Sequence, residues 1–310
     1  MTDAISGLAD SQEVLAGQWR LCVTVSGAAD SPADLDNGDT SWVLASVPGT
    51  AAGALRDAGQ FDPEAPSPLH DKDIWYVCDF AADNLGERIL RMDGLATIAE
   101  VFLNGEPILI SQSMFQGHDV AVEVQEQNRL AICFRALQPH LEQKGPRARW
   151  RPQLATSQGL RLVRTTLLGH MPGWCPEIHA VGPYRPIYLI DPDAPRLEAT
   201  CISATLAQDR AGSLTVSTRI SNGSGTPVLT CAGESCDMQL REDGSYAGEL
   251  HLPDVKPWMP HTHGEPTLYD LTIETGSTSI PLGKTGFRRI EVDRGPDGKG
   301  FGLVVNGIPV

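Results

Sequence analysis

The stretch AEVFLNGEPILI, residues 99–110, decides the fold class of this 310-residue chain. Asn104-Gly105 strongly favours a two-residue hairpin turn, because both central positions of the preferred turn need a positive φ. Apolar residues stand on both sides of the turn. The stretch therefore predicts two antiparallel strands joined at residues 104 and 105.

The segments that follow the hairpin continue the β pattern. Residues 118–124, HDVAVEV, and residues 128–136, NRLAICFRA, alternate apolar and polar side chains with a period of two. In the second segment Arg129 and Arg135 fall on the face opposite the apolar residues. Strands with one buried face predict antiparallel sheets stacked as a sandwich.

Helical patterns are few and short. Thr50 is a good N-cap for a helix over residues 51–59, AAGALRDAG, and a second short helix is predicted over residues 137–145. The 31 glycines and 23 prolines indicate many turns between short strands. The sequence therefore predicts an all-β protein.

A domain boundary is predicted at residues 191–198, DPDAPRLE, where Pro192 and Pro195 interrupt the strand pattern. The short strands that follow are spaced as in an immunoglobulin-like sandwich. The chain ends in an apolar segment just after Asn306-Gly307, a hairpin signal with no second strand after it. Natural termini seldom lie there, so a longer parent protein is expected.

Charge and cysteine content limit the expected partners and location. The formal net charge of −15 argues against nucleic acid and anionic membranes, because phosphate groups repel such a chain. The N-terminus has no basic region followed by an apolar run, and no stretch has the length of a membrane span. Seven scattered cysteines favour reduced thiols and a cytoplasmic location, with a local Cys231–Cys236 disulfide as the open alternative.

Ordered blocks of sequence run along almost the whole chain. They are WVLASVPGT (42–50), DPEAPSPLHDKDIWYVCDF (62–80), ILRMDGLATIAEVFLNGEPI (89–108), SMFQGHDVAVEV (113–124), VGPYRPIYLI (181–190), KPWMPHTHGEPTLYDLTI (256–273), GFRRIE (286–291) and FGLVVNGIPV (301–310). In this order they resemble glycoside hydrolase family 2, nearest to its β-mannosidase-like branch. The match depends on the ordered set, because each block alone is a weak signal.

The resemblance implies a domain order. It implies a galactose-binding-like jelly-roll sandwich over residues 1–193, an immunoglobulin-like sandwich over residues 194–284 and the start of a truncated (β/α)₈ barrel over residues 285–310. The parent would be a retaining β-glycosidase in carbohydrate metabolism. The partners of this chain would be that missing barrel and the sugar in its pocket.

The resemblance also implies where the catalytic groups lie. A retaining glycosidase needs two carboxylic acids. In the family both are glutamates at barrel strand ends, one of them preceded by Asn, and this chain contains no Asn-Glu pair. No catalytic residue is therefore predicted, and the 310-residue chain is expected to be inactive alone.

The segment 147–186 is long for a sandwich connection, and such loops are often functional. Aromatic rings stack on sugars and charged groups hydrogen-bond to them. The sugar-binding candidates in this loop are Trp150, Arg164, His170, Trp174 and Glu177.

The resemblance singles out one position in that loop. In β-mannosidase-like relatives the matching loop presents a Trp-Asp pair to the sugar, but here Cys175 follows Trp174. Mannose as the substrate is therefore open, and Glu177 is a candidate substitute for the Asp. The alternative is that Trp174 packs beneath the loop and Glu177 is solvated. An apolar surface is expected near Trp150, Trp174 and His261.

A pair of histidines, His261 and His263, forms a further motif. It lacks a third ligand at metal spacing, so a loop at a domain interface is favoured over a metal site. No metal or cofactor is predicted. The rival functions are a free-standing carbohydrate-binding or structural module, or the front end of a β-galactosidase, β-glucuronidase or exo-glucosaminidase. The sugar, the linkage and whether the chain forms homo-oligomers stay open.

Overall fold

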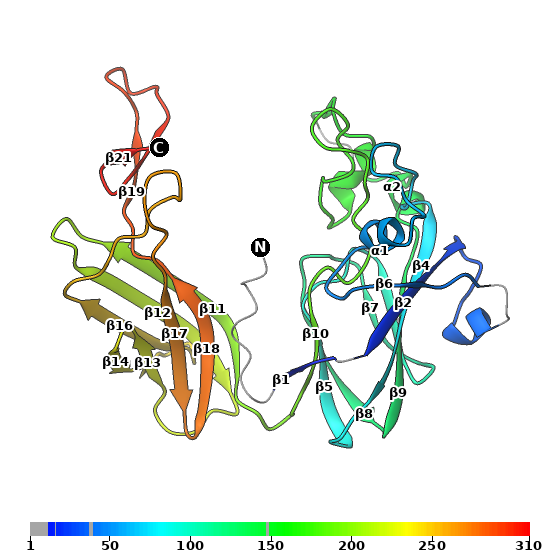
Figure 1. Ribbon diagram of the computed structural model, residues 1–310, viewed down its shortest axis with the longest axis horizontal. Helices are drawn as coiled ribbons and strands as arrows, with labels where there is room; N and C mark the ends of the chain where they lie inside the picture. Colours follow the sequence, from blue (N-terminus) through cyan, green and yellow to red (C-terminus); the bar gives the residue numbers. More distant parts are fainter. Residues whose placement is uncertain (1–11, 16, 37–39, 147–148) are drawn as a thin grey trace. The chain divides into compact units, whose positions relative to one another are not determined.

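The computed structural model describes residues 12–15, 17–36, 40–146 and 149–310. The chain divides into two compact units, here called the first unit (Glu13–Pro192) and the second unit (Asp193–Val310). Strands dominate both units (Figure 1), and every strand pair whose register is described is antiparallel. The all-β prediction is confirmed. Within the described ranges, no helix is long and apolar enough to cross a membrane.

The first unit contains two sheets. The larger has six strands in the order β3 (Val43–Leu44), β2 (Gln18–Val25), β4 (Lys72–Ala81), β9 (Gln127–Phe134), β6 (Ala99–Leu103) and β7 (Glu106–Ser111). The smaller has four strands in the order β1 (Gln12–Val14), β10 (Ile187–Ile190), β5 (Gly86–Met92) and β8 (His118–Val124).

The two sheets of the first unit share one apolar core. Tyr76 and Ile132 from the larger sheet belong to the same buried cluster as Leu90 and Ile187 from the smaller one. Alternating apolar residues produce this arrangement, since every second side chain of a strand points to the same face. The predicted sandwich is therefore confirmed for this part of the chain.

The predicted hairpin joins β6 to β7. Asn104 and Gly105 have φ angles of 52° and 90°, as a turn with two left-handed central residues requires. The Asn104 side chain also accepts a hydrogen bond from the backbone nitrogen of Arg129 at 2.9 Å. The turn is thus tied to β9, the strand beside β6.

The larger sheet differs from prediction because its second face is also partly buried. Trp75 and Cys133 on that face form a separate apolar cluster with Leu35, which lies on the short 3₁₀ helix η2 (Pro32–Asp36). Arg135 was predicted on a solvent-facing side, yet its side chain is mostly buried and paired with Asp73. The segment that connects β2 to β3 provides this cover, which the strand pattern alone does not reveal.

Both predicted helices are present, but the second is shorter than predicted. Helix α1 (Ala51–Asp57) begins after Thr50, whose hydroxyl accepts a hydrogen bond from the Gly53 nitrogen at 3.3 Å. Helix α2 (Gln138–Leu141) has only four residues. Gly145-Pro146 follows soon after, and a residue before proline disfavours helical backbone.

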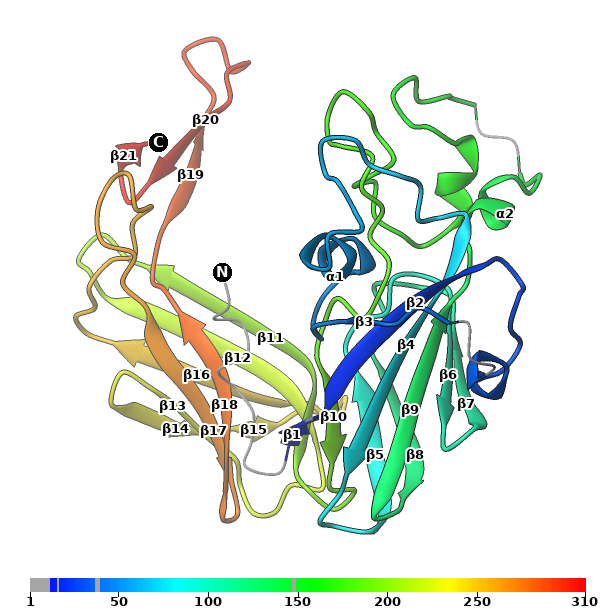
Figure 2. The ribbon, with the colours of Figure 1, turned by 45° about the vertical axis from the view of Figure 1, so that its right-hand side comes forward.

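The second unit begins with another sandwich (Figure 2). One sheet has the order β11 (Arg196–Leu206), β12 (Gly212–Ser221), β16 (Tyr246–Leu252) and β15 (Gln239–Leu240). The other has the order β14 (Glu234–Asp237), β13 (Val228–Cys231), β17 (Tyr269–Thr275) and β18 (Thr278–Thr285). Leu214, Val216, Leu229 and Ile273 lie in the core between them, as in an immunoglobulin-like sandwich.

The last part of the second unit is a three-stranded sheet of β19 (Ile290–Asp293), β20 (Gly302–Val305) and β21 (Ile308–Pro309). Asn306 and Gly307 have φ angles of 52° and 85° and join β20 to β21. The hairpin predicted to lack its second strand therefore has a short one. The division into residues 194–284 and a barrel start at 285–310 stays a prediction.

Candidate functional site

The predicted loop is organised around a short 3₁₀ helix, η3 (Gln158–Leu162). Ser157 caps it, accepting a hydrogen bond from the Gly159 nitrogen at 3.1 Å. A Cβ on Gly159 would lie 2.0 Å from the Leu141 carbonyl oxygen, so only glycine allows this close approach to the end of α2. The start of the loop is therefore fixed by backbone packing.

His170, one of the predicted site residues, is buried beside a second buried histidine, His179, and both rings lie close to the half-buried His70. The Nδ1 atoms of His70 and His179 are 3.2 Å apart, and their ring centroids are separated by 3.9 Å. The His170 centroid lies 4.8 Å from that of His179 and 5.7 Å from that of His70. His70 and His179 were not singled out from the sequence, because their separation of 109 residues carries no spacing signal.

Burial keeps these histidines neutral. It lowers the pKa of His179 to about 3 and that of His170 to about 4, and neighbouring imidazoles act in the same direction. The pKa of His70 is also lowered, mainly by burial, although the Asp71 and Glu177 carboxylates act in the opposite direction. At neutral pH the cluster therefore holds the end of the loop as packed, uncharged rings.

In the described part of the chain, neither this cluster nor any other place brings together three His, Cys, Asp or Glu side chains that could hold a metal ion. A cavity of about 10 Å³ lies beside the histidines and also borders Arg135 and Thr97. His263 hydrogen-bonds through Nδ1 to the Thr262 hydroxyl at 2.8 Å in an exposed turn.

The tip of the loop presents Trp174 to solvent. Its side chain is 76% exposed, which contradicts the alternative in which it packs beneath the loop. The turn is closed by hydrogen bonds from the Trp174 and Cys175 nitrogens to the Met171 carbonyl oxygen, at 3.1 and 3.2 Å. Glu177 is exposed, and its carboxylate is close enough to His70 to influence that imidazole.

Cys175 occupies the position where the resemblance implies an Asp. Its Sγ accepts a hydrogen bond from the Gly169 nitrogen at 3.3 Å and lies 3.6 Å from the Met171 carbonyl oxygen. The thiol is thus engaged within the loop. It supplies none of the charged acceptor capacity that a carboxylate would offer.

The loop also exposes several large apolar side chains. They are Trp150, Leu154, Leu162, Leu167, Leu168 and Trp174. Trp150 is 64% exposed. Where such side chains form a continuous patch, they mark a surface that binds another molecule. His261, predicted near the same surface, belongs to the second unit.

Arg164 lies in a different setting from the other candidates. Its Nε donates to the Ser113 hydroxyl at 3.3 Å, and it borders a recess of about 350 Å³. Trp150, His170, Trp174 and Glu177 do not border this recess. The structure therefore places Arg164 and His170 in separate cavities and brings Glu177 near His70.

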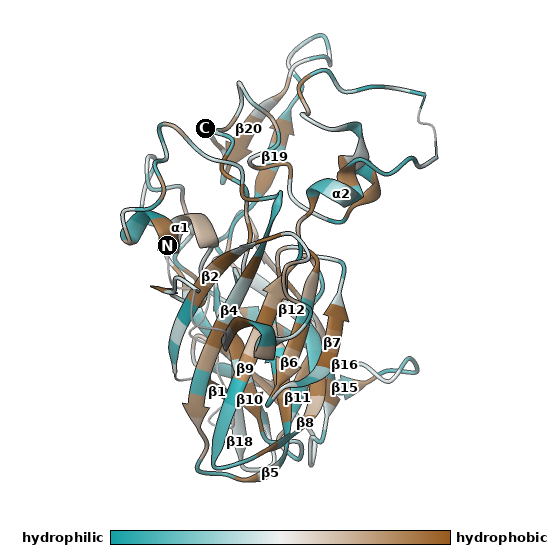
Figure 3. Cartoon of the chain, turned by 90° about the vertical axis from the view of Figure 1, so that its right-hand side faces the viewer, coloured by the Kyte–Doolittle hydropathy of each residue, from teal (hydrophilic) through white to brown (hydrophobic). Residues whose placement is uncertain are grey.

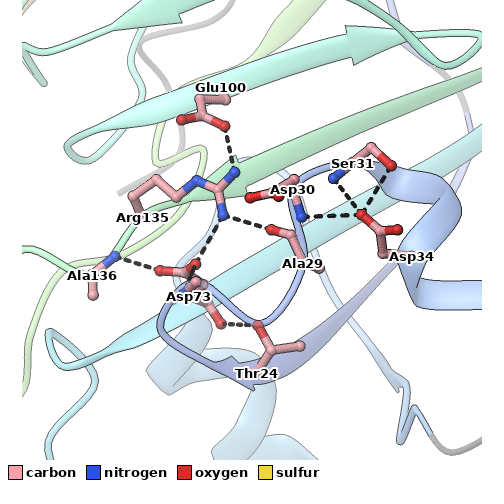
Figure 4. Close-up of polar contacts among 10 residues, drawn as sticks. Thr24, Ala29, Asp30, Ser31, Asp34, Asp73, Glu100, Arg135 and Ala136 are labelled. Atoms are coloured by element: carbon pink, nitrogen blue, oxygen red, sulfur yellow. Dashed lines mark hydrogen bonds and ion pairs between the residues drawn. The ribbon is translucent and has the colours of Figure 1, made fainter.

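A buried ionic network supports the end of the larger sheet (Figure 4). Arg135 donates to Asp73 at 2.9 Å, to Glu100 at 2.6 Å and to the Ala29 carbonyl oxygen at 2.8 Å. The pKa of Arg135 is raised, chiefly by its hydrogen bond to Glu100. Because Arg135 also borders the histidine cavity, the network and the cluster are adjacent supports of one region.

The fold and the long loop define a galactose-binding-like sandwich that is followed by an immunoglobulin-like one. Comparison with known families agrees. The sequence model described as glycosyl hydrolase 2 galactose-binding domain-like matches residues 31–185, half of the 310-residue chain. The chain therefore belongs to the glycosyl hydrolase 2 galactose-binding domain-like family, and the predicted family is confirmed.

Two curated relatives of this chain are both beta-mannosidases. The chain is 26% identical over 242 residues to beta-mannosidase B of Aspergillus terreus, which covers 72% of this chain and 28% of that protein. It is 25% identical over 248 residues to beta-mannosidase B of Aspergillus niger, covering 73% and 29% respectively. The chain thus aligns with less than a third of the length of these relatives.

Solved structures share the fold. The beta-D-mannosidase of Dictyoglomus thermophilum matches 96% of this chain, over 39% of its own length, with a TM-score of 0.69 and 19% identity. The beta-glucuronidase of Bifidobacterium dentium matches 97% of this chain, over 51% of its own, with a TM-score of 0.63 and 18% identity. The exo-chitosanase of Amycolatopsis orientalis has a TM-score of 0.61 at 19% identity and covers 96% of this chain and 36% of its own.

Proposed function

We propose that this chain is the non-catalytic N-terminal portion of a retaining β-glycosidase of the β-mannosidase-like branch. Its family membership and its alignment with less than a third of the β-mannosidase B relatives support this proposal. The catalytic acids would lie in the part of the barrel that comes after residue 310 in the parent protein. The first unit would form one wall of the sugar pocket.

The exposed tip of the loop is the observation that carries the proposed sugar contact. A tryptophan with 76% of its side chain in water gives up the stabilisation that burial would provide, roughly 1.5–3 kcal/mol for a large apolar side chain. A sugar face stacked on Trp174 would recover part of this stabilisation by covering the indole ring. Glu177 would hydrogen-bond to hydroxyl groups, and Trp150 with the neighbouring leucines would contact the barrel. Arg164 is not assigned to this contact, because it borders a separate recess.

The structure changes the proposed part of His170. With 3% of its surface exposed, its imidazole is not available for direct sugar contact. We assign it instead to holding the loop through the histidine cluster. Its substitution would then alter the position of Trp174 rather than remove a hydrogen bond to the substrate.

The three-stranded sheet of the second unit offers a second surface for the barrel (Figure 3). Register places Ile290 and Val292 of β19 on the same face as Leu303 of β20 and Ile308 of β21. These four side chains are between 40% and 54% exposed. An apolar sheet face left in water favours association. We therefore propose that it packs on the catalytic barrel, as the start of that domain.

The sugar is proposed on the chemistry at the loop tip. Cys175 hydrogen-bonds within the loop, so the carboxylate expected beside Trp174 in a β-mannosidase is missing. Glu177 follows Cys175 closely in the chain, is exposed, and would substitute for the missing carboxylate. If Glu177 does so, β-mannosides are the substrates; otherwise the substrates would be those of a β-galactosidase, β-glucuronidase or exo-glucosaminidase.

The reading frame beyond codon 310 gives the first test. We expect an Asn-Glu pair and a second glutamate at barrel strand ends, and a stop codon at that point would contradict the proposal. In the longer protein, Trp174→Ala should lower kcat/KM for an aryl β-mannoside on the order of 10-fold. The control is Leu240→Ala, a comparably exposed residue of the second unit, which should leave kcat/KM unchanged.

The alternative function is a free-standing carbohydrate-binding module, which the exposed Trp174 also fits. Calorimetric titration of the 310-residue chain with mannose, galactose and β-linked oligosaccharides separates the two. Submillimolar affinity that Trp174→Ala abolishes would favour the module. The pocket-wall proposal expects weak binding, since most of the pocket would belong to the barrel.

A cytoplasmic location is also proposed. It is supported by the seven cysteines, all of which have free thiols in the structure. Labelling of these thiols in intact cells, followed by mass spectrometry, tests this. Disulfides in the protein taken from cells would count against it.

A further inference from the structure

The recess beside Arg164 has the properties of a small-molecule site. Its volume of about 350 Å³ falls in the range of ligand pockets, roughly 300–1,000 Å³. Its polar wall is formed by Gln112, Ser113, Gln116, His140 and Arg164. Its residues come from the position just before β6, from the segment that follows β7, from α2 and from η3 and its C-terminal neighbours.

The apolar part of the wall is anchored in a small core of its own. Ile98 is buried in a cluster with Leu141 and Leu160, and Val163 packs against that cluster. Ile98 and Val163 both border the recess, as does the half-exposed Leu162. An apolar surface beside polar groups suits a sugar ring, which has C–H faces and hydroxyl edges.

Arg164 is held by its neighbours in a defined position. Its backbone forms a parallel bridge with Ser113, and its carbonyl oxygen accepts a hydrogen bond from the Met114 nitrogen at 3.0 Å. The Ser113 hydroxyl, on a buried residue, accepts from Arg164 Nε at 3.3 Å and from the Phe115 nitrogen at 3.3 Å. The Nε edge of the Arg164 guanidinium is therefore fixed, and the N–H groups of its two terminal nitrogens remain available as donors for a ligand.

The charge of the recess is positive within an acidic chain. In the described part of the chain, no Asp or Glu borders it, and no carboxylate forms a salt bridge with Arg164. The formal net charge of the chain is −15. A guanidinium with two terminal NH₂ groups binds carboxylate in a bidentate manner. Gln112, Gln116 and His140 would then serve hydroxyl groups.

We propose that this recess binds a carboxylate-bearing sugar of monosaccharide size, with the carboxylate on Arg164 and the hydroxyls on the amides and His140. The proposal does not depend on the proposed glycosidase function, since all of its residues lie in the first unit. It adds a recognition site for an acidic sugar to a domain whose loop tip is proposed to contact the substrate.

Calorimetric titration of the 310-residue chain with D-glucuronate tests it. D-Glucose is the matched ligand without the carboxylate, and acetate is the matched carboxylate without the hydroxyls. We expect D-glucuronate to bind more than about 10-fold tighter than either, because it alone offers both a carboxylate for charge-assisted hydrogen bonds and hydroxyl groups for the neutral ones. Raising NaCl from about 50 to 500 mM should weaken the binding several-fold.

Arg164→Gln should weaken D-glucuronate binding on the order of 10-fold or more, and Arg164→Lys should recover part of it. The matched control is Arg161→Gln on the preceding 3₁₀ helix η3, an exposed arginine whose Nη1 contacts Gln158 at 3.3 Å and which does not border the recess. It should bind like the unmodified chain. Circular dichroism would confirm that all three variants are folded.

Three outcomes would overturn the proposal. Acetate binding as tightly as D-glucuronate would mean that only an adventitious anion is held. D-Glucose binding as tightly as D-glucuronate would show that the carboxylate, and hence Arg164, does not contribute to recognition. An unchanged affinity of Arg164→Gln for D-glucuronate would show that the sugar binds at another site. Each leaves the glycosidase proposal intact, because that depends on Trp174 and the reading frame.

Discussion

The Nδ1 atoms of His70 and His179 lie 3.2 Å apart, and His179 Nδ1 is also 3.4 Å from the backbone nitrogen of Leu69, which donates to it. An imidazole nitrogen that accepts a hydrogen bond carries no proton. His179 is therefore unprotonated at Nδ1, and His70 Nδ1–H is the donor between the two rings. The pair fits together only while His179 is neutral.

This pairing predicts loss of stability in mild acid. His170 and His179 have folded-state pKa values of about 4 and about 3, below the ordinary 6.5, so their contribution is complete above pH 6.5. As the pH falls below 6.5, these two histidines bind protons in the unfolded chain but not in the folded chain. Each of the two groups then contributes about 1.4 kcal/mol, so the free energy of unfolding in urea should fall by roughly 2–3 kcal/mol between pH 7.5 and 5.5.

Substitutions locate the effect. His170→Gln should make the dependence on pH shallower, whereas His251→Gln, at an exposed histidine beside Glu249, should leave it unchanged. Equal slopes for both variants would show that the buried cluster does not cause the acid sensitivity.

The Arg135–Asp73 pair predicts a large loss of stability when one partner is removed. Asp73 is 1% exposed and accepts hydrogen bonds from Arg135 and from the Ala136 nitrogen at 2.8 Å. Arg135→Met would leave that carboxylate buried without its cation, at a cost of about 3–5 kcal/mol. Urea unfolding at pH 7.5 measures this.

The exposed pair Arg56–Asp57 is the control for that substitution. Arg56→Met should change the free energy of unfolding by less than about 1 kcal/mol, because solvated ion pairs contribute little. Similar losses for the two methionine variants would refute the distinction between buried and exposed pairs.

Gly159 predicts a steric effect on the loop. In Gly159→Ala the new Cβ would meet the Leu141 carbonyl oxygen at 2.0 Å, so η3 must move away from α2. We expect a loss of at least about 1 kcal/mol and faster amide hydrogen exchange over residues 155–165.

Gly53→Ala in α1 is the opposite case. The nearest atom to its Cβ would be the Thr50 hydroxyl at 3.5 Å, and alanine favours helix, so a gain of roughly 0.5–1 kcal/mol is expected. If both variants lose stability equally, close packing at Gly159 is not what matters.

The thiols predict a graded reaction with Ellman's reagent. Burial raises the pKa of Cys22 and Cys78 to about 12 and that of Cys231 to about 11, so these thiols should stay protonated and unreactive in the native chain. The exposed Cys201 should react first, followed by the half-exposed Cys175 and Cys236. In denaturant all seven thiols should react. Fast reaction of Cys22 in the native chain would contradict its buried placement.

The strand pattern predicted most of the architecture because alternation is a local property. The hairpin at Asn104-Gly105, the cap at Thr50 and the change of domain near Pro192 depend on residues close in sequence. The second buried face of the larger sheet was missed, because Trp75 and Cys133 are covered by a connecting segment. Arg135 looked solvent-facing for the same reason.

The candidate site divides in the same way. The sequence identified the loop and its aromatic residues, since unusual length and composition are visible along a single chain. Tertiary structure alone brought His70 and His179 to His170, buried Asp73 beside Arg135 and set Arg164 at the edge of a recess with Ser113. The His70–His179, Asp73–Arg135 and Ser113–Arg164 contacts join residues 50 or more positions apart, and packing rather than local pattern decides which distant side chains meet.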